Sequence, residues 1–596
     1  MSFRLAFVAA LSAACGSNSA PPPPPPPPAW QPGQPLTLDV SSAFPANTAL
    51  RDAYGGGTAT VKSDGTVTLT PDANGVVLLE QDGAQASPFT WQDATVYFVM
   101  TDRFFDGDPT NNDSYGRQPD GAQEVGTWHG GDLKGLTAKL DYIQSLGVTA
   151  IWISPAVEQV HGWVGGGNGD FKYYGYHGYW ALDFTQLDAN FGTNDDMQAF
   201  VDGAHQRGIR VLLDVVLNHP GYATGDDLVN YLPSVFRDGT GAQFQAFSPG
   251  AGQTWLNWND LVDYGSANWA NWWTPKWIRA GLGPSGMFDQ PSSTDPLTES
   301  LTFLPDFKTE STAVADVPPF FSVKAATTDG TGFTADESKT VRQYLVEWQS
   351  AWVRQFGFDG FRCDTAKNVE LGSWAALKQA ATGALQDWKA ANPSKKIDDA
   401  PFWMTGEVYG HGVAKDSYFS DGGFDSLINF DFQGSIRDLL TANGTLAAGS
   451  STLETLYANY AGLISADPAF DVLSYLSSHD TRLFFGQIAK NDPVVQRQAG
   501  TALLLVPGGA QVFYGDESGR MFGPTLSDSV QGTRSDMNWS SIDQTILSHF
   551  QKLGAFRKKH AAVGAGAHAK IDSPQNTYAF SRKTAGDTVV IVLTTL

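Results

Sequence analysis

Three acidic residues in this 596-residue chain follow apolar runs, and each has polar neighbours suited to acid–base chemistry. They are Asp364 in GFRCDT, Glu407 in FWMTGE and Asp480 in SSHD. Cleavage of an acetal needs a carboxylic acid that protonates the leaving oxygen and a carboxylate that attacks or shields the cationic carbon. Each acid alone could equally cap a helix or form a structural ion pair. Their shared position after apolar runs favours a common site.

Arg362 and the residues before Glu407 predict different ionisation states for two of these acids. Arg362 is two residues before Asp364, so both side chains would lie on one face of a strand. The guanidinium would then lower the pKa of Asp364 and keep it ionised. Glu407 follows a buried strand, where partial desolvation would raise its pKa. The pair could supply both halves of acetal cleavage.

The elements that must position these residues are continuous apolar runs separated by amphipathic helical segments. The runs cover 95–100, 148–154, 209–216, 358–363, 402–406, 426–432, 472–477 and 510–515. Eight buried strands alternating with helices predict a (β/α)8 barrel, and the strand number and chain length favour it over a doubly wound sheet. Because barrel strands end on one face, the polar residues after them should converge: Asp214, Asn218, His219, Arg362, Asp364, Glu407, His479 and Asp480.

Residues 220–334, after the third strand, have little periodicity and predict an inserted domain, domain B. Six tryptophans lie there: Trp255, Trp258, Trp269, Trp272, Trp273 and Trp277. They are consistent with either sugar-stacking platforms or the core of an irregular domain. The barrel, domain A, would occupy 91–219 and 335–562.

Both ends of the chain are rich in strand patterns. Residues 577–596 read as two strands joined at 585–587, while 58–70 has the pattern of a hairpin and 75–80 that of another strand. Two strands alone are marginally stable. We therefore expect 31–88 and 563–596 to form one antiparallel β-domain, domain C. The alternative is two independent β-modules.

The first 15 residues have the arginine, short apolar run and small residues of a signal peptide. Cys15 would be either a lipidated residue or lie just after ordinary cleavage at Ala14. Residues 16–30 form a linker whose prolines 21–28 would span about 25 Å at roughly 3.1 Å per residue. We expect an exported protein, either periplasmic, secreted or an outer-surface lipoprotein. Cys363 is the only other cysteine, so no intrachain disulfide is expected once Cys15 is lipidated or removed.

The composition restricts the partners. A formal net charge of −24 and a pI near 4.7 argue against nucleic-acid and anionic-membrane partners. The chain contains 18 Trp, and aromatic faces together with carboxylates and amides suit a neutral, hydroxyl-rich ligand.

Several motifs together resemble the α-amylase family. DVVLNH (214–219), GFRCDTAKN (360–368), TGEVYG (405–410) and SSHD (477–480) resemble its four signature regions in order and spacing. GVTAIWISP (147–155) and LPDF (304–307) resemble two more, and HGWVGGG (161–167) is most similar to the bacterial periplasmic branch. The resemblance implies hydrolysis of internal α-1,4-glucosidic bonds of starch, glycogen or maltodextrins, with retention through a glycosyl–aspartate intermediate.

The resemblance also implies residue roles. Asp364 would be the nucleophile, Glu407 the general acid/base and Asp480 the transition-state stabiliser. The implied substrate-binding residues are Tyr179, His219, Arg362, Lys367, Asn368 and His479. Asn368 and Ser478 depart from the family pattern, which usually has His and Asn there. The resemblance implies that residue 368 lines the part of the site that binds the acceptor sugar, so Asn368 would change the side chain there.

Calcium is implied at two places, and oxygen ligands suit this ion. The first site, between domains A and B, would use Asn218, Asp306 and the backbone carbonyl of Asn368. The second would use Asp106, Asp108, Asn111, Asn112, Asp132 and the carbonyl of Gly130. A metal-free turn rich in Asp and Asn is the alternative for the second site.

Two rival functions remain at this point. A transglycosylase of the same family would share the same catalytic residues, so the sequence does not separate water from sugar as the acceptor. A non-catalytic glucan-binding surface protein is disfavoured, because such proteins generally lose a carboxylate. We expect a monomer whose partner is an α-glucan polysaccharide or malto-oligosaccharide.

Overall fold

The computed structural model describes residues 29–118, 123–279, 292, 294–332 and 338–595. The predicted signal peptide, Cys15 and the proline run lie outside the described residues. Within the described part, no helix combines the length and apolar character needed to cross a membrane.

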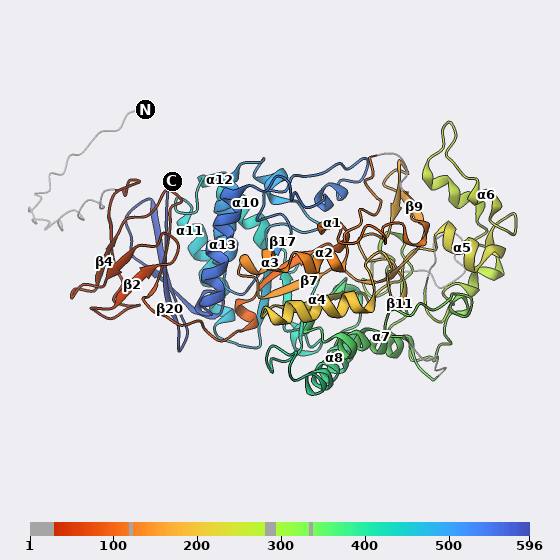
Figure 1. Ribbon diagram of the computed structural model, residues 1–596, viewed down its shortest axis with the longest axis horizontal. Coiled ribbons are helices and arrows are strands. Elements are labelled where there is room, and N and C mark those ends of the chain that lie inside the picture. Colours follow the sequence, from red (N-terminus) through yellow and green to blue (C-terminus); the bar gives the residue numbers. More distant parts are fainter. Residues whose placement is uncertain (1–28, 119–122, 280–291, 293, 333–337, 596) are drawn as a thin grey trace, which may run out of the picture.

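A closed barrel of eight parallel strands forms the centre of the molecule, which confirms the predicted fold class (Figure 1). Its strands are β6 (Thr95–Val99), β7 (Ala150–Ile153), β12 (Arg210–Val215), β13 (Gly360–Cys363), β14 (Trp403–Gly406), β15 (Ser426–Asn429), β16 (Asp471–Tyr475) and β17 (Gly509–Phe513). The principal helices around it are α2 (Leu133–Ala138), α3 (Leu140–Ser145), α4 (Asn194–Gln206), α7 (Val341–Phe356), α8 (Leu371–Ala391), α10 (Asp431–Asn443), α11 (Ser450–Ile464), α12 (Pro493–Leu504) and α13 (Gln544–Lys559). Shorter helices are α1 (Thr101–Phe104), α9 (Ser417–Ser420) and α14 (Ala562–Ala565).

Local sequence signals set the boundaries of α7, the helix that leads into β13. Thr340 caps α7 in a reciprocal pair with Gln343, and Gly357 ends the helix with a φ of 83°. That left-handed turn returns the chain directly to β13, whose four residues are all buried. The helix-to-strand geometry that presents Arg362 and Asp364 is therefore encoded locally.

The inserted segment packs around its tryptophans. It includes α5 (Gly225–Tyr231) and α6 (Ala242–Gln245) and lies at the far end of the barrel from the β-domain (Figure 1). Trp258, Trp269, Trp272, Trp273 and Trp277 are at most 2% exposed. Trp277 also stacks on Trp348 of α7, with ring centroids 5.5 Å apart. For these five residues, core packing is the correct interpretation, because burial leaves no ring face for a sugar; Trp255 is half-buried.

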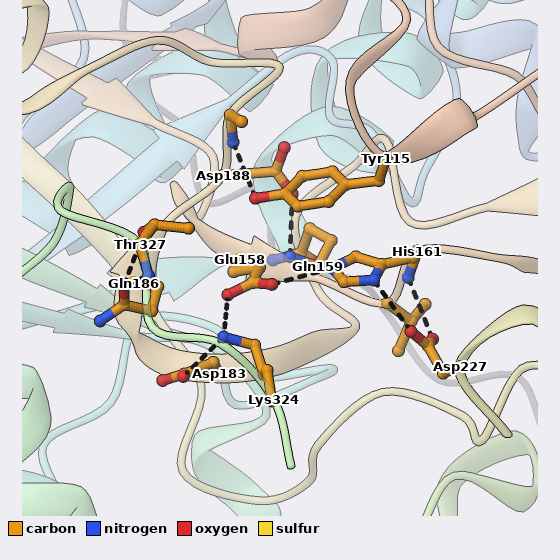
Figure 2. A network of polar contacts seen from close by, with 12 residues as sticks. Tyr115, Glu158, Gln159, His161, Asp183, Gln186, Asp188, Asp227, Lys324 and Thr327 are labelled. Atoms are coloured by element: carbon orange, nitrogen blue, oxygen red, sulfur yellow. Dashed lines mark hydrogen bonds and ion pairs between the residues drawn. The ribbon is translucent and has the colours of Figure 1, made fainter. Parts of the chain in front are cut away.

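Buried charges join this segment to the barrel loops (Figure 2). Lys324 of the insert contacts Glu158 of β8 (Val157–Gln159) at 2.7 Å and Asp183 of β11 (Ala181–Leu187) at 3.1 Å. His161 donates its backbone N–H to Asp227 of α5 at 3.0 Å, and its ring contacts Glu158 at 2.8 Å. The next residues form the hairpin of β9 (Trp163–Gly166) and β10 (Phe171–Tyr174), so the network fixes where that hairpin begins.

The two ends of the chain share one antiparallel sheet, as expected. Its order is β18 (Ala567–Ile571), β19 (Thr577–Lys583), β20 (Thr588–Thr594), β5 (Val76–Gln81), β2 (Ala49–Asp52) and β3 (Thr58–Thr60). The first and last parts of the chain lie side by side in this sheet (Figure 1). They meet where β5 pairs with β20, with Leu79 opposite Val590. A lone β5 or β19–β20 hairpin would expose one apolar face, and the pairing buries it.

The hairpin predicted for residues 58–70 is wrong. A tight turn does form there, since Lys62 N–H donates to the Thr66 carbonyl at 2.8 Å. Beyond it the strands separate: β3 pairs with β2, whereas β4 (Thr66–Leu69) pairs with β1 (Leu36–Asp39) in a second sheet. Val61 and Val67 pack into one core that both sheets cover, so burial outweighs the local hairpin pattern.

Candidate active site

Neighbouring barrel strands place the predicted acids side by side. In the parallel register, Asp214 of β12 lies opposite Arg362 of β13, which lies opposite Thr405 of β14. The backbone N–H of Glu407 donates to the Cys363 carbonyl at 2.9 Å, so Glu407 begins its loop next to Asp364. The residues that the sequence separates by more than 190 positions therefore end on one face of the barrel.

Arg362 lies at the centre of this group and is 1% exposed. Its Nη1 contacts Asp364 Oδ1 at 2.7 Å and Asp214 Oδ1 at 3.1 Å, and its Nη2 contacts Glu407 Oε2 at 2.9 Å. Tyr179 OH donates to the Asp214 carboxylate at 2.7 Å. One guanidinium thus holds the predicted nucleophile and the predicted acid in fixed positions, with Asp214 as its buried counter-ion.

Asp480 has its own partners. His479 Nε2 lies 2.8 Å from Asp480 Oδ2, and Arg534 Nη2 donates to Oδ1 at 2.6 Å. Arg534 also donates to Tyr173 OH at 2.6 Å and to the His479 carbonyl at 3.1 Å. The Ser478 hydroxyl accepts a hydrogen bond of 3.2 Å from the Asp480 backbone N–H. Ser478, which departs from the family pattern, therefore has a local structural role.

The sequence analysis missed Arg534 and Tyr173. Both lie outside the apolar runs whose ends were inspected, in the loop after β17 and in β10. The stretch GTRSDMNW around Arg534 was a usable signal, because a charged residue in a loop beside a predicted site invites a role. Only the folded chain shows that this charge reaches Asp480.

The three acids differ in their pKa values. Burial raises the pKa of Asp364 to about 6 and that of Glu407 to about 7, although Arg362 opposes both shifts. The predicted direction for Glu407 is correct, but the expected net lowering for Asp364 is wrong, since desolvation outweighs the guanidinium. Burial also disfavours the charge on Asp480, but His479 and Arg534 more than offset it and hold that pKa below its usual range.

A cleft of about 720 Å³ opens over these residues. Its lining includes Val164, Gly165, Gly166, Gly167, Tyr173, His177, Tyr179, Trp180, His219, Tyr222, Leu256, Asn259, Leu301, Thr302, Phe303, Leu304, Asp364, Thr365, Glu407, Asp480, Asp528, Val530 and Arg534. Tyr179 stacks against His479 with ring centroids 5.2 Å apart. Burial lowers the pKa of His219 to about 4, so its ring is neutral and can hydrogen-bond a hydroxyl.

Two predicted substrate-binding residues lie elsewhere. Lys367 is exposed and does not line the cleft. The Asn368 side chain turns toward the insert, where its Nδ2 donates to the Pro296 carbonyl at 2.8 Å and to Glu299 Oε1 at 2.9 Å. The structure thus directs Asn368 to a loop of domain B and not into the cleft.

The first predicted calcium site brings three ligand groups together. A terminal atom of the Asn218 amide lies 3.3 Å from Asp306 Oδ1 and 3.0 Å from the Asn368 carbonyl oxygen. The amide could donate its NH₂ to both oxygens, or its oxygen could join them around a cation. Arg279 contacts the other oxygen of Asp306, so Oδ1 is free to serve as a ligand. These residues fit an oxygen-coordinated ion.

The second predicted site is a loop folded around Asp132. Asn111 Oδ1 and Asn112 Oδ1 are buried and have no hydrogen-bond partner among the described residues. A buried carbonyl oxygen without a hydrogen-bond donor is unfavourable, and a bound cation would offset that cost. Asp108 instead contacts Lys134 at 2.5 Å, and Asp132 accepts backbone N–H groups from Gly107 and Asp108. Across the described residues, no cluster of three or more His, Cys, Asp or Glu side chains is arranged for a metal, so an ion at either place would also need Asn or carbonyl oxygens.

A closed parallel barrel with two bridged acids and a third acid on one cleft defines a glycoside-cleaving barrel enzyme. The model of the α-amylase catalytic domain matches residues 98–237 and 335–548. The chain belongs to the α-amylase family. The unmatched stretch between these ranges lies mainly in the inserted segment.

Individual relatives agree with this assignment. The periplasmic α-amylase of Escherichia coli (strain K12) is 48% identical over 575 residues, covering 94% of this chain and 81% of that protein. A cyclomaltodextrin glucanotransferase of Klebsiella oxytoca is 23% identical, covering 84% and 70%. The solved α-amylase of Geobacillus thermoleovorans, complexed with acarbose, superposes with a TM-score of 0.54 at 23% identity, covering 84% of this chain and 87% of that one, which shows a shared fold.

Proposed function

We propose that the protein is an exported α-amylase that hydrolyses internal α-1,4-glucosidic bonds of starch, glycogen or maltodextrins with retention. The observation that carries this proposal is the placement of Asp364 and Glu407 on one guanidinium, with Asp480 on the same cleft. The 48% identity to a protein named periplasmic α-amylase supports both the reaction and the export.

The reaction proceeds in two displacements. In the first, the Asp364 carboxylate attacks the anomeric carbon, and the Glu407 carboxylic acid protonates the departing glycosidic oxygen. In the second, the Glu407 carboxylate takes a proton from water, which attacks the same carbon and releases Asp364. Between about pH 6 and pH 7, Asp364 is ionised while Glu407 retains its proton, so both groups begin in the required states.

The surrounding residues stabilise the charges that develop. Arg362 compensates the charge that moves between the two acids, since it contacts both. Asp480, kept ionised by its own partners, can accept hydrogen bonds from sugar hydroxyls as the ring gains positive charge. Neutral His219 and the aromatic face of Tyr179 are available for the hydroxyls and the apolar face of that sugar.

Product analysis tests this function. Purified protein should convert maltoheptaose and soluble starch to short malto-oligosaccharides, and NMR of fresh products should show the α-anomer first. Accumulation of the β-anomer would contradict the retaining mechanism. Longer or cyclic products from maltoheptaose would favour the transglycosylase, for which the 23%-identical glucanotransferase provides the supporting resemblance.

We also infer that calcium binds at the two candidate sites. Asn218, Asp306 and the Asn368 carbonyl would hold one ion. Asp106, Asn111, Asn112 and the Gly130 carbonyl would hold the other, which Asp108 and Asp132 would join by exchanging their contacts with Lys134 and with backbone N–H groups. Each ion would cross-link loops and neutralise oxygens. Removing metal with a chelator should lower the thermal unfolding midpoint, because an ion at about 100 times its Kd stabilises by about 2.7 kcal/mol. Added calcium should restore the midpoint, while magnesium should restore it less. An unchanged midpoint would contradict this inference.

A further inference from the structure

One aromatic residue on the cleft lies outside every predicted role. Phe303 lines the cleft and is 79% exposed, whereas the residues of the catalytic floor are buried; Asp364 is 6% and Tyr179 is 9% exposed. Phe303 therefore lies at the mouth of the cleft, where an accessible ring face meets whatever extends out of it. Covering this ring with the apolar face of a ligand would remove apolar surface from water, which is favourable.

The backbone around Phe303 is held in an uncommon conformation. Thr302 and Phe303 have φ values of 49° and 66°, in the left-handed region that non-glycine residues rarely adopt. The Thr302 carbonyl accepts a hydrogen bond of 2.6 Å from Tyr222 OH, and Tyr222 itself lines the cleft. The ring is thus supported on a braced loop beside the substrate path.

The other end of this loop is attached to Asn368. Its side-chain amide donates to the Pro296 carbonyl and to Glu299, and Glu299 is four residues before Phe303 along the chain. Ser300 Oγ also donates to the Leu304 carbonyl at 2.6 Å and closes the loop on itself. The residue that departs from the family pattern therefore positions a loop of the insert.

The mouth of the cleft also offers polar groups. Asn259 and Asp528 line the same cleft and are both partly exposed. Sugars present an apolar face of C–H groups and a rim of hydroxyls, so a cleft lined by an aromatic ring and by amide and carboxylate groups suits them. A glucan chain that enters the cleft and continues outward matches this combination.

We propose that Phe303 is a sugar-stacking residue for glucose units outside the cleavage point, and that Asn368 positions its loop. The proposal rests on the proposed function, because the glucan is its ligand. Phe303 determines chain-length preference: it binds polysaccharide and long oligosaccharides, and it contributes nothing to substrates that fill only the floor of the cleft.

The test compares kcat/KM on soluble starch and on maltotriose for the wild type, Phe303→Ala, Phe303→Leu and Phe303→Tyr. For Phe303→Ala and Phe303→Leu, we expect kcat/KM on starch to fall roughly 2- to 12-fold, mostly through KM, the range of an aromatic stacking contact. Activity on maltotriose should stay unchanged, and Phe303→Tyr, which keeps the ring, should resemble the wild type. Val323→Ala is the matched control, since Val323 is 60% exposed in the same insert but does not line the cleft.

Two further measurements distinguish a role in substrate binding from a role in protein stability. Because Phe303 is mostly exposed, its substitution should leave the thermal midpoint unchanged. Asn368→Ala should reproduce the selective loss on starch by releasing the loop. An equal loss on both substrates, no loss on starch, or a lowered midpoint in Phe303→Ala would overturn the proposal. A wild type inactive on both substrates would instead contradict the proposed function.

Discussion

The two ends of the barrel use buried charges in opposite ways. At the cleft, the three carboxylates of Asp214, Asp364 and Glu407 share the Arg362 guanidinium. At the other end, His560 contacts Glu80 Oε2 at 2.6 Å and Asp587 Oδ1 at 2.9 Å, and Lys559 contacts Glu80 at 2.7 Å.

The pKa shifts follow this difference. Burial raises the pKa of all three acids that share Arg362, namely Asp214, Asp364 and Glu407. In the His560 cluster, burial is outweighed by the partners, so the pKa of His560 is raised while those of Glu80 and Asp587 are lowered. At the cleft, the excess of negative charge around Arg362 supplies groups with shifted pKa values at some cost in stability. At the other end, the two cations Lys559 and His560 match the two carboxylates Glu80 and Asp587, and these contacts stabilise the junction of β5, α13 and the β19–β20 turn.

The largest expected effect is on catalysis. Glu407→Gln should reduce kcat by about 10²- to 10⁴-fold, because it removes the proton donor. Above about pH 7, where the buried Glu407 is ionised, the substitution should not lower the thermal midpoint, since it removes one of the negative charges that share Arg362. Starch hydrolysis and calorimetry measure the two quantities. Asp226→Asn is a matched control: burial raises the pKa of Asp226 to about 6, but it does not line the cleft. Lost stability in Glu407→Gln would contradict the contrast between the two regions.

The next effect is on stability at the opposite end. His560→Gln leaves two buried carboxylates with one fewer cation, and breaking such a cluster should cost about 3 kcal/mol of unfolding free energy. Because the pKa of His560 is raised on folding, its contribution is complete below the unfolded pKa of about 6.5 and disappears as pH rises through the folded value. The difference between variant and wild type, measured by denaturant unfolding, should therefore shrink at alkaline pH, while activity per folded molecule stays unchanged.

His568→Gln provides the control for this pH dependence. His568 also contacts a carboxylate, Glu454, at 2.9 Å, but burial lowers its pKa to about 4. It is neutral near pH 7, so its removal should not produce the same dependence above pH 6. Equal pH profiles for the two variants would show that the charge of His560 has no special role.

The smallest expected effect concerns Arg534. Arg534→Met removes the 2.6 Å charged hydrogen bond to Asp480, and kcat should fall about tenfold, the value of one charge-assisted bond. The loss should grow at acidic pH, because Asp480 without Arg534 protonates more readily. Arg534→Lys should recover part of kcat. A loss confined to KM, or one that does not depend on pH, would exclude a role through the ionisation of Asp480.

The amino-acid sequence by itself determined the barrel and most of its candidate catalytic residues. Continuous apolar strands between capped helices are local patterns, and a closed parallel barrel necessarily brings the residues after its strands to one face. Asp364 and Glu407 could therefore be placed together although 42 residues lie between them in the sequence. The shared sheet of the two chain ends was also predictable, because neither end could bury its apolar face alone.

Only the tertiary structure decided how the remaining groups are used. Burial of five insert tryptophans, the separation of β3 from β4, the net pKa of Asp364, the contact of Arg534 with Asp480 and the direction of Asn368 all depend on segments distant in sequence. Periodicity and spacing describe one segment at a time. Desolvation, cross-strand pairing and loop contacts are set by which distant segments surround a residue, and those neighbours exist only in the folded chain.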